Sequence, residues 1–194
     1  QFRVIAGRTV LEWALLSLLS HPRIGPIVVV LPASGLPEGM VLPDQVLVTT
    51  GGATRTQSVK NGLAALPQNA ASALPVLVHD AARPCVPSRV IDGLLNALQA
   101  ADASAPSLPM ADALKRTDAG FVSVSREGLA RVQTPQAFRA GVLTKALAEI
   151  SSDASYDDEL EAARRIGAQI ALVQGSPFLM KLTWPEDFDV MERL

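Results

Sequence analysis

Four short stretches of this sequence place charged or hydroxyl side chains beside turns, where they could bind an anion. The first is Gly51-Gly-Ala-Thr-Arg-Thr-Gln-Ser58, a glycine pair that enters a predicted helix with an arginine in its first turn. Backbone amides and the positive end of a helix can bind a phosphate or hydrogen-bond a base at such a place. A tight turn with a good helix cap would explain the same residues equally well.

The second stretch is His79-Asp-Ala-Ala-Arg-Pro84, which follows a predicted buried strand. A carboxylate such as Asp80 is costly to bury without a partner. Asp80 could meet substrate hydroxyls or a hydrated Mg²⁺, with Arg83 supporting the loop or a phosphate. The alternative is an internal pair of Asp80 and Arg83 that orders the turn, worth roughly 1 kcal/mol if exposed. We expect His79 to pack rather than to react.

The third and fourth stretches each contribute a cation. Arg126 follows a predicted hairpin and precedes Thr134-Pro-Gln136; it could bind a phosphate bidentately, although a lone arginine on a hairpin is usually a solvated charge. Lys181 lies in the apolar segment 178–182, which we predict to be a strand directly before a helix. It could offer its charge to a phosphoryl group. A lysine on an edge strand that discourages aggregation is the alternative.

Other kinds of catalytic machinery are missing from the sequence. It contains no Ser–His–Asp set, no pair of metal-binding cysteines and no Walker-type phosphate loop, which argues against hydrolases and ATPases. The acidic cluster 157–159 resembles a metal site, but we expect it in the first turn of a helix, where acids favour the helix dipole.

The elements that must position these residues alternate between strands and helices. We expect strands at 27–31, 46–49, 75–78, 169–174 and 178–182. We expect helices at 9–20, from Thr54, from Ser88, at 139–149 and 157–166, and after a cap formed by Thr183 and Glu186. This alternation predicts a doubly wound α/β sheet, mainly parallel, with helices on both faces. Such sheets bind ligands at the carboxyl ends of their strands, where Gly51-Gly52 and Asp80 are expected.

Residues 110–137 depart from this pattern. Lys115-Arg-Thr117 and Phe121–Ser125 flank an Asp118-Ala-Gly120 turn, which predicts a β-hairpin. Its strands carry few large apolar residues, and a hairpin of that kind is marginal alone. We therefore expect a protruding β-arm at about 111–137 that extends onto a partner subunit.

Bulk composition limits the class of protein. The 194 residues predict one domain, and 48% hydrophobic against 19% charged residues provide for a sizeable core. A net charge of −2 without a basic stripe gives no indication of nucleic-acid binding, and apolar runs such as 27–31 are too short to span a membrane. The lone cysteine, Cys85, cannot form an internal disulfide, which favours a reducing, cytoplasmic compartment.

Taken together and in this order, the four stretches resemble the 2-C-methyl-D-erythritol 4-phosphate cytidylyltransferase family of the non-mevalonate isoprenoid pathway. The matching strings are residues 51–59, 78–84, 134–136 and 181–187, and the resemblance covers nearly the whole chain. It implies that residues 1–194 form a single nucleotidyltransferase domain of Rossmann-like fold. It also implies a homodimer that exchanges its β-arms, and transfer of CMP from CTP to a small polyol phosphate with release of pyrophosphate.

The resemblance further implies roles for individual residues. Three would contact the nucleotide: Gly52, Ser58 and Ala81. Asp80 would contact the erythritol hydroxyls, with Arg83 also on the substrate side. Lys181 would act at the α-phosphate of CTP, and Arg126 from the partner's arm would grip the substrate phosphate with help from Thr134. Mg²⁺ would be bound mainly through the phosphates of CTP.

Two further expectations concern the ends of the chain. The family's glycine-rich triphosphate loop is expected directly before Gln1-Phe2, and we expect little or no activity without it. Some relatives are fused to a cyclodiphosphate synthase, so a further domain after Leu194 stays open.

One internal position departs from the family's pattern. Ala113 stands where some relatives carry a hydroxyl that binds the substrate phosphate, so that contact is not expected here.

Three other interpretations stay open. A cytidylyltransferase acting on ribitol 5-phosphate or another polyol phosphate would share the mechanism and differ in the acceptor. A sugar-nucleotide-dependent glycosyltransferase would need an Asp-x-Asp motif after a strand, which the sequence lacks. A catalytically inactive dimeric binding module would keep the fold without the chemistry.

Overall fold

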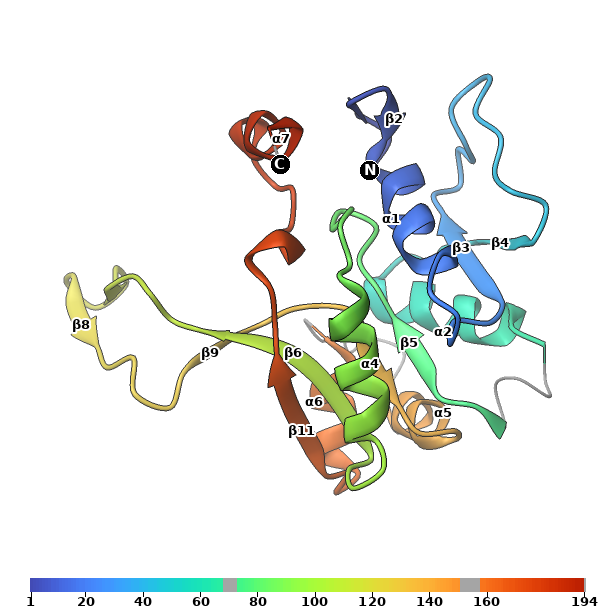
Figure 1. The fold of residues 1–194 in the computed structure, drawn as a ribbon. Helices are drawn as coiled ribbons and strands as arrows, with labels where there is room; N and C mark the ends of the chain where they lie inside the picture. Colours follow the sequence, from blue (N-terminus) through green and yellow to red (C-terminus); the bar gives the residue numbers. More distant parts are fainter. Residues whose placement is uncertain (68–72, 151–157, 194) are drawn as a thin grey trace.

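The computed structural model describes residues 1–67, 73–150 and 158–193 as a mixed α/β structure (Figure 1). The strands are β1 (Val4–Ile5), β2 (Arg8–Thr9), β3 (Ile27–Leu31), β4 (Val46–Thr50), β5 (Val76–Val78), β6 (Ala103–Pro109), β7 (Leu114–Arg116), β8 (Val122–Val124), β9 (Ala130–Val132), β10 (Gln136–Phe138) and β11 (Ile170–Gln174). The helices are α1 (Val10–Leu19), α2 (Arg55–Ala65), α4 (Ser88–Ala97), α5 (Val142–Ala148), α6 (Glu159–Arg165), α7 (Pro185–Glu192) and the 3₁₀ helix η1 (Pro177–Leu179).

The largest sheet has the strand order β11-β6-β10-β5, and β9 pairs with the far end of β6. Strands β6 and β11 are parallel, whereas β10 runs antiparallel between β5 and β6, so the sheet is mixed. Strands β3 and β4 form a separate parallel pair. The expected α/β fold with helices on both faces is confirmed. The sheet is less parallel than expected, because β10 and β9 both pair antiparallel with β6.

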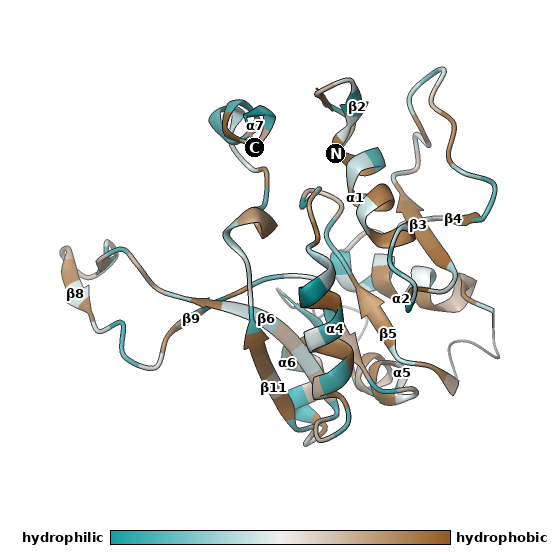
Figure 2. Cartoon of the chain, viewed as in Figure 1, coloured by the Kyte–Doolittle hydropathy of each residue, from teal (hydrophilic) through white to brown (hydrophobic). Residues whose placement is uncertain are grey.

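Helices cover both faces of the largest sheet. Helix α4 buries Val90, Ile91 and Leu94 against one face, where Ala137 of β10 lies. Helices α2, α5 and α6 cover the other face around Phe138, whose side chain is fully buried. Figure 2 shows that β3 and β11 are among the most hydrophobic parts of the chain, as expected for strands that pack against helices.

Helix α1 begins where the sequence pattern predicts it. The backbone N–H of Thr9 donates to Glu12 Oε2 over 2.7 Å, and the N–H of Glu12 donates to Thr9 Oγ1 over 3.2 Å. This reciprocal pair satisfies two amides that the helix itself leaves free. The helix then packs Leu11 and Leu15 against β3 and β4.

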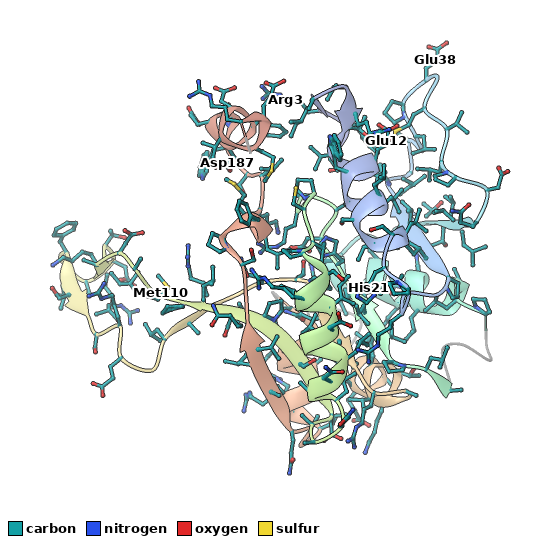
Figure 3. The ribbon with its side chains drawn as sticks, in the orientation of Figure 1. Arg3, Glu12, His21, Glu38, Met110 and Asp187 are labelled. Atoms are coloured by element: carbon teal, nitrogen blue, oxygen red, sulfur yellow. The ribbon has the colours of Figure 1, made fainter. Side chains whose placement is uncertain are left out.

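The C-terminal helix α7 packs beside the N-terminal hairpin of β1 and β2. Ile5 and Met191 share a small core cluster, and the guanidinium of Arg3 lies 4.2 Å from the centre of the Phe188 ring. Figure 3 shows Arg3 and Asp187 near each other at this end of the molecule. The two ends of the described chain are thus held side by side.

The predicted β-hairpin is present. Strands β7 and β8 pair antiparallel, from Leu114 with Val124 to Arg116 with Val122. The hairpin projects away from the layered core, beyond the position of Met110 that Figure 3 labels, and Phe121 at its turn is 68% exposed. The hairpin makes few contacts with the rest of the chain, as its sparse apolar content predicts.

The strand predicted at 178–182 is wrong. Residues 177–179 form the 3₁₀ helix η1, because Pro177 has no N–H for a strand ladder and Ser176 Oγ accepts from the N–H of Phe178 over 3.3 Å. The predicted cap of the last helix is also wrong. Asp187, not Glu186, accepts from the backbone N–H groups of Thr183 and Trp184 over 2.7 and 2.8 Å.

No helix in the described ranges is both long enough and apolar enough to cross a membrane.

Strand β6 was not expected from the sequence, since it consists of small residues and prolines, Ala103-Ser-Ala-Pro-Ser-Leu-Pro109. It is nevertheless buried along most of its length, lying between β10 and β11 with helices on both sides.

We predict that Phe138→Ala lowers the free energy of unfolding by about 3–5 kcal/mol, because it opens a cavity between the sheet and three helices. Val41→Ala, in the loop between β3 and β4 where the side chain is 80% exposed, is the matched control and should change it by less than about 0.5 kcal/mol. Urea unfolding of both variants measures the difference, and equal losses would contradict this account of the core.

Candidate active site

A single carboxylate, that of Asp80, lies at the carboxyl end of β5 within reach of three cations. Lys181 Nζ is 3.1 Å from its Oδ2, Arg55 Nη2 is 3.6 Å from its Oδ1 and Arg83 Nε is 3.8 Å from its Oδ2. The cations come from three parts of the chain: α2, the loop after β5 and the segment before α7. The structure therefore brings together three stretches that the sequence analysis singled out separately.

These charges set the ionisation of Asp80. Burial disfavours the charged carboxylate, but Lys181, Arg55 and Arg83 outweigh it and hold the pKa of Asp80 below its usual value. Burial also lowers the pKa of Arg83, and the attraction of Asp80 opposes that shift. Asp80 is therefore a fixed negative charge at neutral pH and no reservoir of protons.

A second carboxylate, that of Glu159, contacts the cluster through Arg55. Its side chain is 2% exposed and forms a short ion pair with Arg55, which thus bridges Glu159 and Asp80. Burial raises the pKa of Glu159, and Arg55 opposes that rise. The expected helix position is confirmed for Asp158 and Glu159, while Asp157 lies outside the described residues. Helical spacing to the buried Ala162 and Ala163 is the signal that could have placed Glu159 inward.

Lys181 is the most accessible cation of the cluster, with a side chain that is 51% exposed. Because η1 replaces the predicted strand, its interpretation as an edge-strand lysine is wrong. The segment before it is fixed by Arg83, whose Nη1 donates to the carbonyl of Leu179 over 2.5 Å. Lys181 thus lies on a short, anchored connection that directs it toward Asp80.

The side-chain amide of Gln133 anchors the same connection from the other side. Gln133 Nε2 donates to the carbonyl of Ser176 over 2.9 Å, and its Oε1 accepts from the N–H of Ser176 over 3.1 Å. A Cβ at Gly175 would lie 2.4 Å from that Oε1. The side-chain amide pairs with the N–H and C=O of Ser176 as the backbone of a neighbouring strand would. A side chain at position 175 would collide with this amide.

The loop after β5 is held by a chain of hydrogen bonds through His79 and Thr134. The N–H of Asp80 donates to Thr134 Oγ1 over 3.0 Å, and that oxygen is 3.1 Å from His79 Nδ1. His79 Nε2 is 3.0 Å from the carbonyl oxygen of Arg83. Desolvation of the ring lowers the pKa of His79 to about 4, so the ring is neutral at physiological pH. As expected, His79 packs and is not placed as a reacting base.

The glycine turn lies at the carboxyl end of β4. The N–H of Gly51 donates to the carbonyl of Leu31 over 2.8 Å, which ties the turn to the end of β3, and the N–H of Gly52 donates to Ser58 Oγ over 3.1 Å. A Cβ at Gly52 would lie 2.1 Å from Gln57 Cγ, so this position requires glycine. Glycine at 52 therefore lets the turn pack closely against the first turn of α2.

A cavity of about 470 Å³ adjoins this site and reaches two members of the charged cluster, Asp80 and Arg55. It lies between β3 and β5, and its lining includes Ser58, Asp80 and Ala81, together with Arg55. Two of the three expected nucleotide contacts, Ser58 and Ala81, thus share one cavity with Asp80 and Arg55, and Gly52 hydrogen-bonds to Ser58. Most of the wall is apolar, from β3, β5, α1 and α2.

Arg126 is the candidate that lies apart. It follows β8 in the projecting hairpin and donates to the backbone carbonyl of Ala111. In the described ranges, no hydrogen bond or ion pair joins Arg126 to the Asp80 cluster. Within one chain the structure does not bring it to the site.

An α/β sheet with cations gathered around a carboxylate at a strand end, beside a glycine turn, defines a class of protein that binds phosphorylated small molecules. The family model described as "IspD: 2-C-methyl-D-erythritol 4-phosphate cytidylyltransferase" matches residues 1–194. The chain belongs to this family.

Relatives and solved structures agree with this assignment. The chain is 45% identical over 199 residues to the "Bifunctional enzyme IspD/IspF" of Caulobacter vibrioides (strain NA1000 / CB15N), covering 100% of this chain and 51% of that protein. It is 42% identical to the "2-C-methyl-D-erythritol 4-phosphate cytidylyltransferase" of Laribacter hongkongensis, with 96% and 84% covered. The crystal structure of the Thermus thermophilus enzyme of that name superposes with a TM-score of 0.84 at 32% identity, over 99% and 91% of the two chains. The chain spans about half the length of the first bifunctional relatives it matches.

We predict a pH dependence of stability that arises from His79. Because its folded pKa of about 4 lies below the ordinary 6.5, the unfolded chain binds the proton more readily. This stabilising contribution is fully present above pH 6.5, declines as the pH falls and is lost below about pH 4.

The test compares urea unfolding of the parent and His79→Gln between about pH 7.5 and pH 4. The free energy of unfolding of the parent should fall more steeply, with a difference of at most about 3 kcal/mol. Parallel pH profiles would show that the ring is already charged, or already exposed, in the folded protein.

Proposed function

We propose that this chain transfers CMP from CTP to 2-C-methyl-D-erythritol 4-phosphate and releases pyrophosphate, a step in isoprenoid precursor biosynthesis. We further propose that residues 1–194 form one nucleotidyltransferase domain, acting in the cytoplasm, where a lone thiol such as Cys85 stays reduced. Membership in the family and the names of its relatives support the choice of substrates.

The observation that carries the proposal is the cluster of Lys181, Arg55 and Arg83 around Asp80. Three cations against one carboxylate, with Glu159 behind, leave a net positive site at a strand end. A phosphate ester that attacks the α-phosphorus of CTP is already ionised at neutral pH, so it needs no general base. What it needs is positioning and compensation of charge between two anions.

Each residue of the cluster can be given a task. Lys181 donates one N–H to Asp80 and has two more, together with the exposure, to bind the α-phosphate of CTP. Asp80, held ionised, accepts hydrogen bonds from the hydroxyls of the acceptor, with Arg83 keeping it in place. Gly52, Ser58 and Ala81 would hold the nucleotide beside them, because their turn and cavity adjoin the cluster.

Mg²⁺ fits this donor set as an ion that CTP brings with it. In nucleotide sites it takes its oxygen ligands mostly from phosphates and water, with one or two carboxylates. The part of the chain that the structure describes gathers no group of three or more His, Cys, Asp or Glu side chains that could hold a metal. Asp80 is the carboxylate nearest to where the phosphates would lie. When bound, the ion would neutralise part of the triphosphate charge.

The projecting hairpin supports a homodimer in which arms are exchanged. Two of its apolar side chains, Phe121 and Val122, are more than half exposed. Arg126 lies away from the site of its own chain and near the base of this hairpin, so we propose that it binds the acceptor phosphate in the partner's site.

The first test follows pyrophosphate release by the full-length gene product with CTP, Mg²⁺ and the acceptor. We expect release with 2-C-methyl-D-erythritol 4-phosphate and none with ribitol 5-phosphate. Release with ribitol 5-phosphate alone would keep the chemistry and overturn the acceptor. No release with either, from a folded dimer, would favour an inactive binding module.

We predict that Lys181→Ala lowers kcat by about 10²–10³-fold, because it removes one preorganised charge from the transition state. Lys145→Ala is the matched control, an exposed lysine on α5. Steady-state kinetics of both variants decide the matter, and a Lys181→Ala rate within about threefold of the parent would exclude this role.

Arg126→Ala should raise KM for the acceptor and leave KM for CTP unchanged, because the lost contact is to the acceptor phosphate.

Exchange of arms between subunits allows a second test of Arg126. Mixing Lys181→Ala and Arg126→Ala protomers should restore about a quarter of the parent activity, since half the dimers are mixed and each holds one intact site. No recovery in demonstrably mixed dimers would place Arg126 in its own chain's site or outside catalysis.

A further inference from the structure

We propose that His79 and Thr134 are positioning residues, which hold Asp80 and Arg83 in place through a hydrogen-bond chain of fixed direction. Neither side chain needs to touch a substrate for this task. The inference rests on the proposed function only for its kinetic consequences, because the direction of the chain can be observed in the resting protein.

The direction follows from the chemistry of the partners. The carbonyl of Arg83 can only accept, so His79 Nε2, 3.0 Å away, must carry the hydrogen. In a neutral ring Nδ1 is then an acceptor, and the Thr134 hydroxyl, 3.1 Å away, must donate to it. A lone pair of the same hydroxyl accepts the N–H of Asp80 over 3.0 Å. Each group in this series of hydrogen bonds therefore has a fixed role as donor or as acceptor.

The sheet explains why these residues meet. Strands β5 and β10 pair antiparallel, with Gln136 opposite Val78, so the same register continued places Thr134 opposite Asp80. Pro135 has no N–H and cannot continue the ladder. The Thr134 hydroxyl takes the place of a main-chain acceptor for Asp80, two positions beyond the end of β5.

The chain of hydrogen bonds fixes both ends of one turn. The N–H of Arg83 donates to the carbonyl of Asp80 over 2.9 Å, which closes a four-residue turn. The Thr134 hydroxyl accepts from the N–H of Asp80, the first residue of this turn. The His79 ring contacts the carbonyl of Arg83, the last residue of the turn. The two side chains thereby orient Asp80 and Arg83, the carboxylate and one of the cations of the charged cluster.

This assignment gives Thr134 a different task from the one that the family resemblance implies. A phosphate oxygen can only accept, and the hydroxyl hydrogen of Thr134 is already donated to His79. The residue is also 5% exposed. Thr134 should therefore affect catalysis through Asp80, and not as a donor to the acceptor phosphate.

A matched set of variants tests the kinetic consequence. Thr134→Val keeps the shape without the hydroxyl and should lower kcat/KM by up to about 10²-fold, the scale of a small misplacement. Thr134→Ser keeps the hydroxyl and should retain most of the parent activity. His79→Phe should show the same defect as Thr134→Val, and the double variant should be no worse than either, because one chain is broken in each case.

Other results of this set would overturn the proposal. If Thr134→Val raised only KM for the acceptor while His79→Phe did not, Thr134 would be a phosphate ligand. If Thr134→Ser were as impaired as Thr134→Val, the hydroxyl would not be the functional group. Additive losses in the double variant would mean that the two residues act separately.

Nitrogen NMR of the two histidines in the parent protein gives a readout that does not depend on activity. We expect His79 as the neutral ring with hydrogen on Nε2 from about pH 5 to pH 8, with Asp80 and Arg83 as the charged groups facing it. Hydrogen on Nδ1, or titration near the ordinary value of 6.5, would overturn the proposed direction of the hydrogen bonds even if the enzyme is active. The expected ring in a protein that fails to release pyrophosphate would instead overturn the proposed function alone.

Discussion

The need to keep the Asp80 carboxylate ionised while partly buried governs how this chain is arranged. A carboxylate in that position is unfavourable without cations, and no single element supplies them. Arg55 comes from α2, Arg83 from the loop itself and Lys181 from the connection before α7. Stable folding and assembly of the site are therefore one event, because any element that fails to dock leaves Asp80 with fewer compensating charges.

The same cluster has more positive than negative charge. Arg55, Arg83 and Lys181 carry three positive charges, and Asp80 and Glu159 carry two negative ones if both are ionised. Glu159 Oε2 and Arg83 Nε are buried and have no hydrogen-bond partner within the described ranges. The resting site thus carries one excess positive charge and incompletely satisfied polar groups, which suits a protein whose ligands are anions that enter and leave.

Sequence reasoning located most of the parts and few of the contacts between them. Capping patterns and β-branched runs are local, so α1 and β3 could be predicted almost to the residue. The pair of Arg55 and Glu159 joins residues 104 positions apart, and nothing local indicates it. Strand β6 escaped notice because its place in the sheet comes from its neighbours and not from its small residues and prolines. The segment 178–182 misled because it is apolar, whereas Pro177 and Ser176 decide its backbone.

The amide of Gln133 has a consequence for how such chains can diverge. Its two ends occupy the backbone of Ser176, 43 positions further along the chain, and the space it fills exists only while residue 175 has no side chain. A shorter residue at 133 would free that space and strand the Ser176 N–H, whereas any side chain at 175 would expel the amide. A side chain at 175 would also lie 2.9 Å from the backbone carbonyl oxygen of Ser107, so a shorter residue at 133 would not make room for it. Homologous chains should therefore keep glycine at 175 even where position 133 changes.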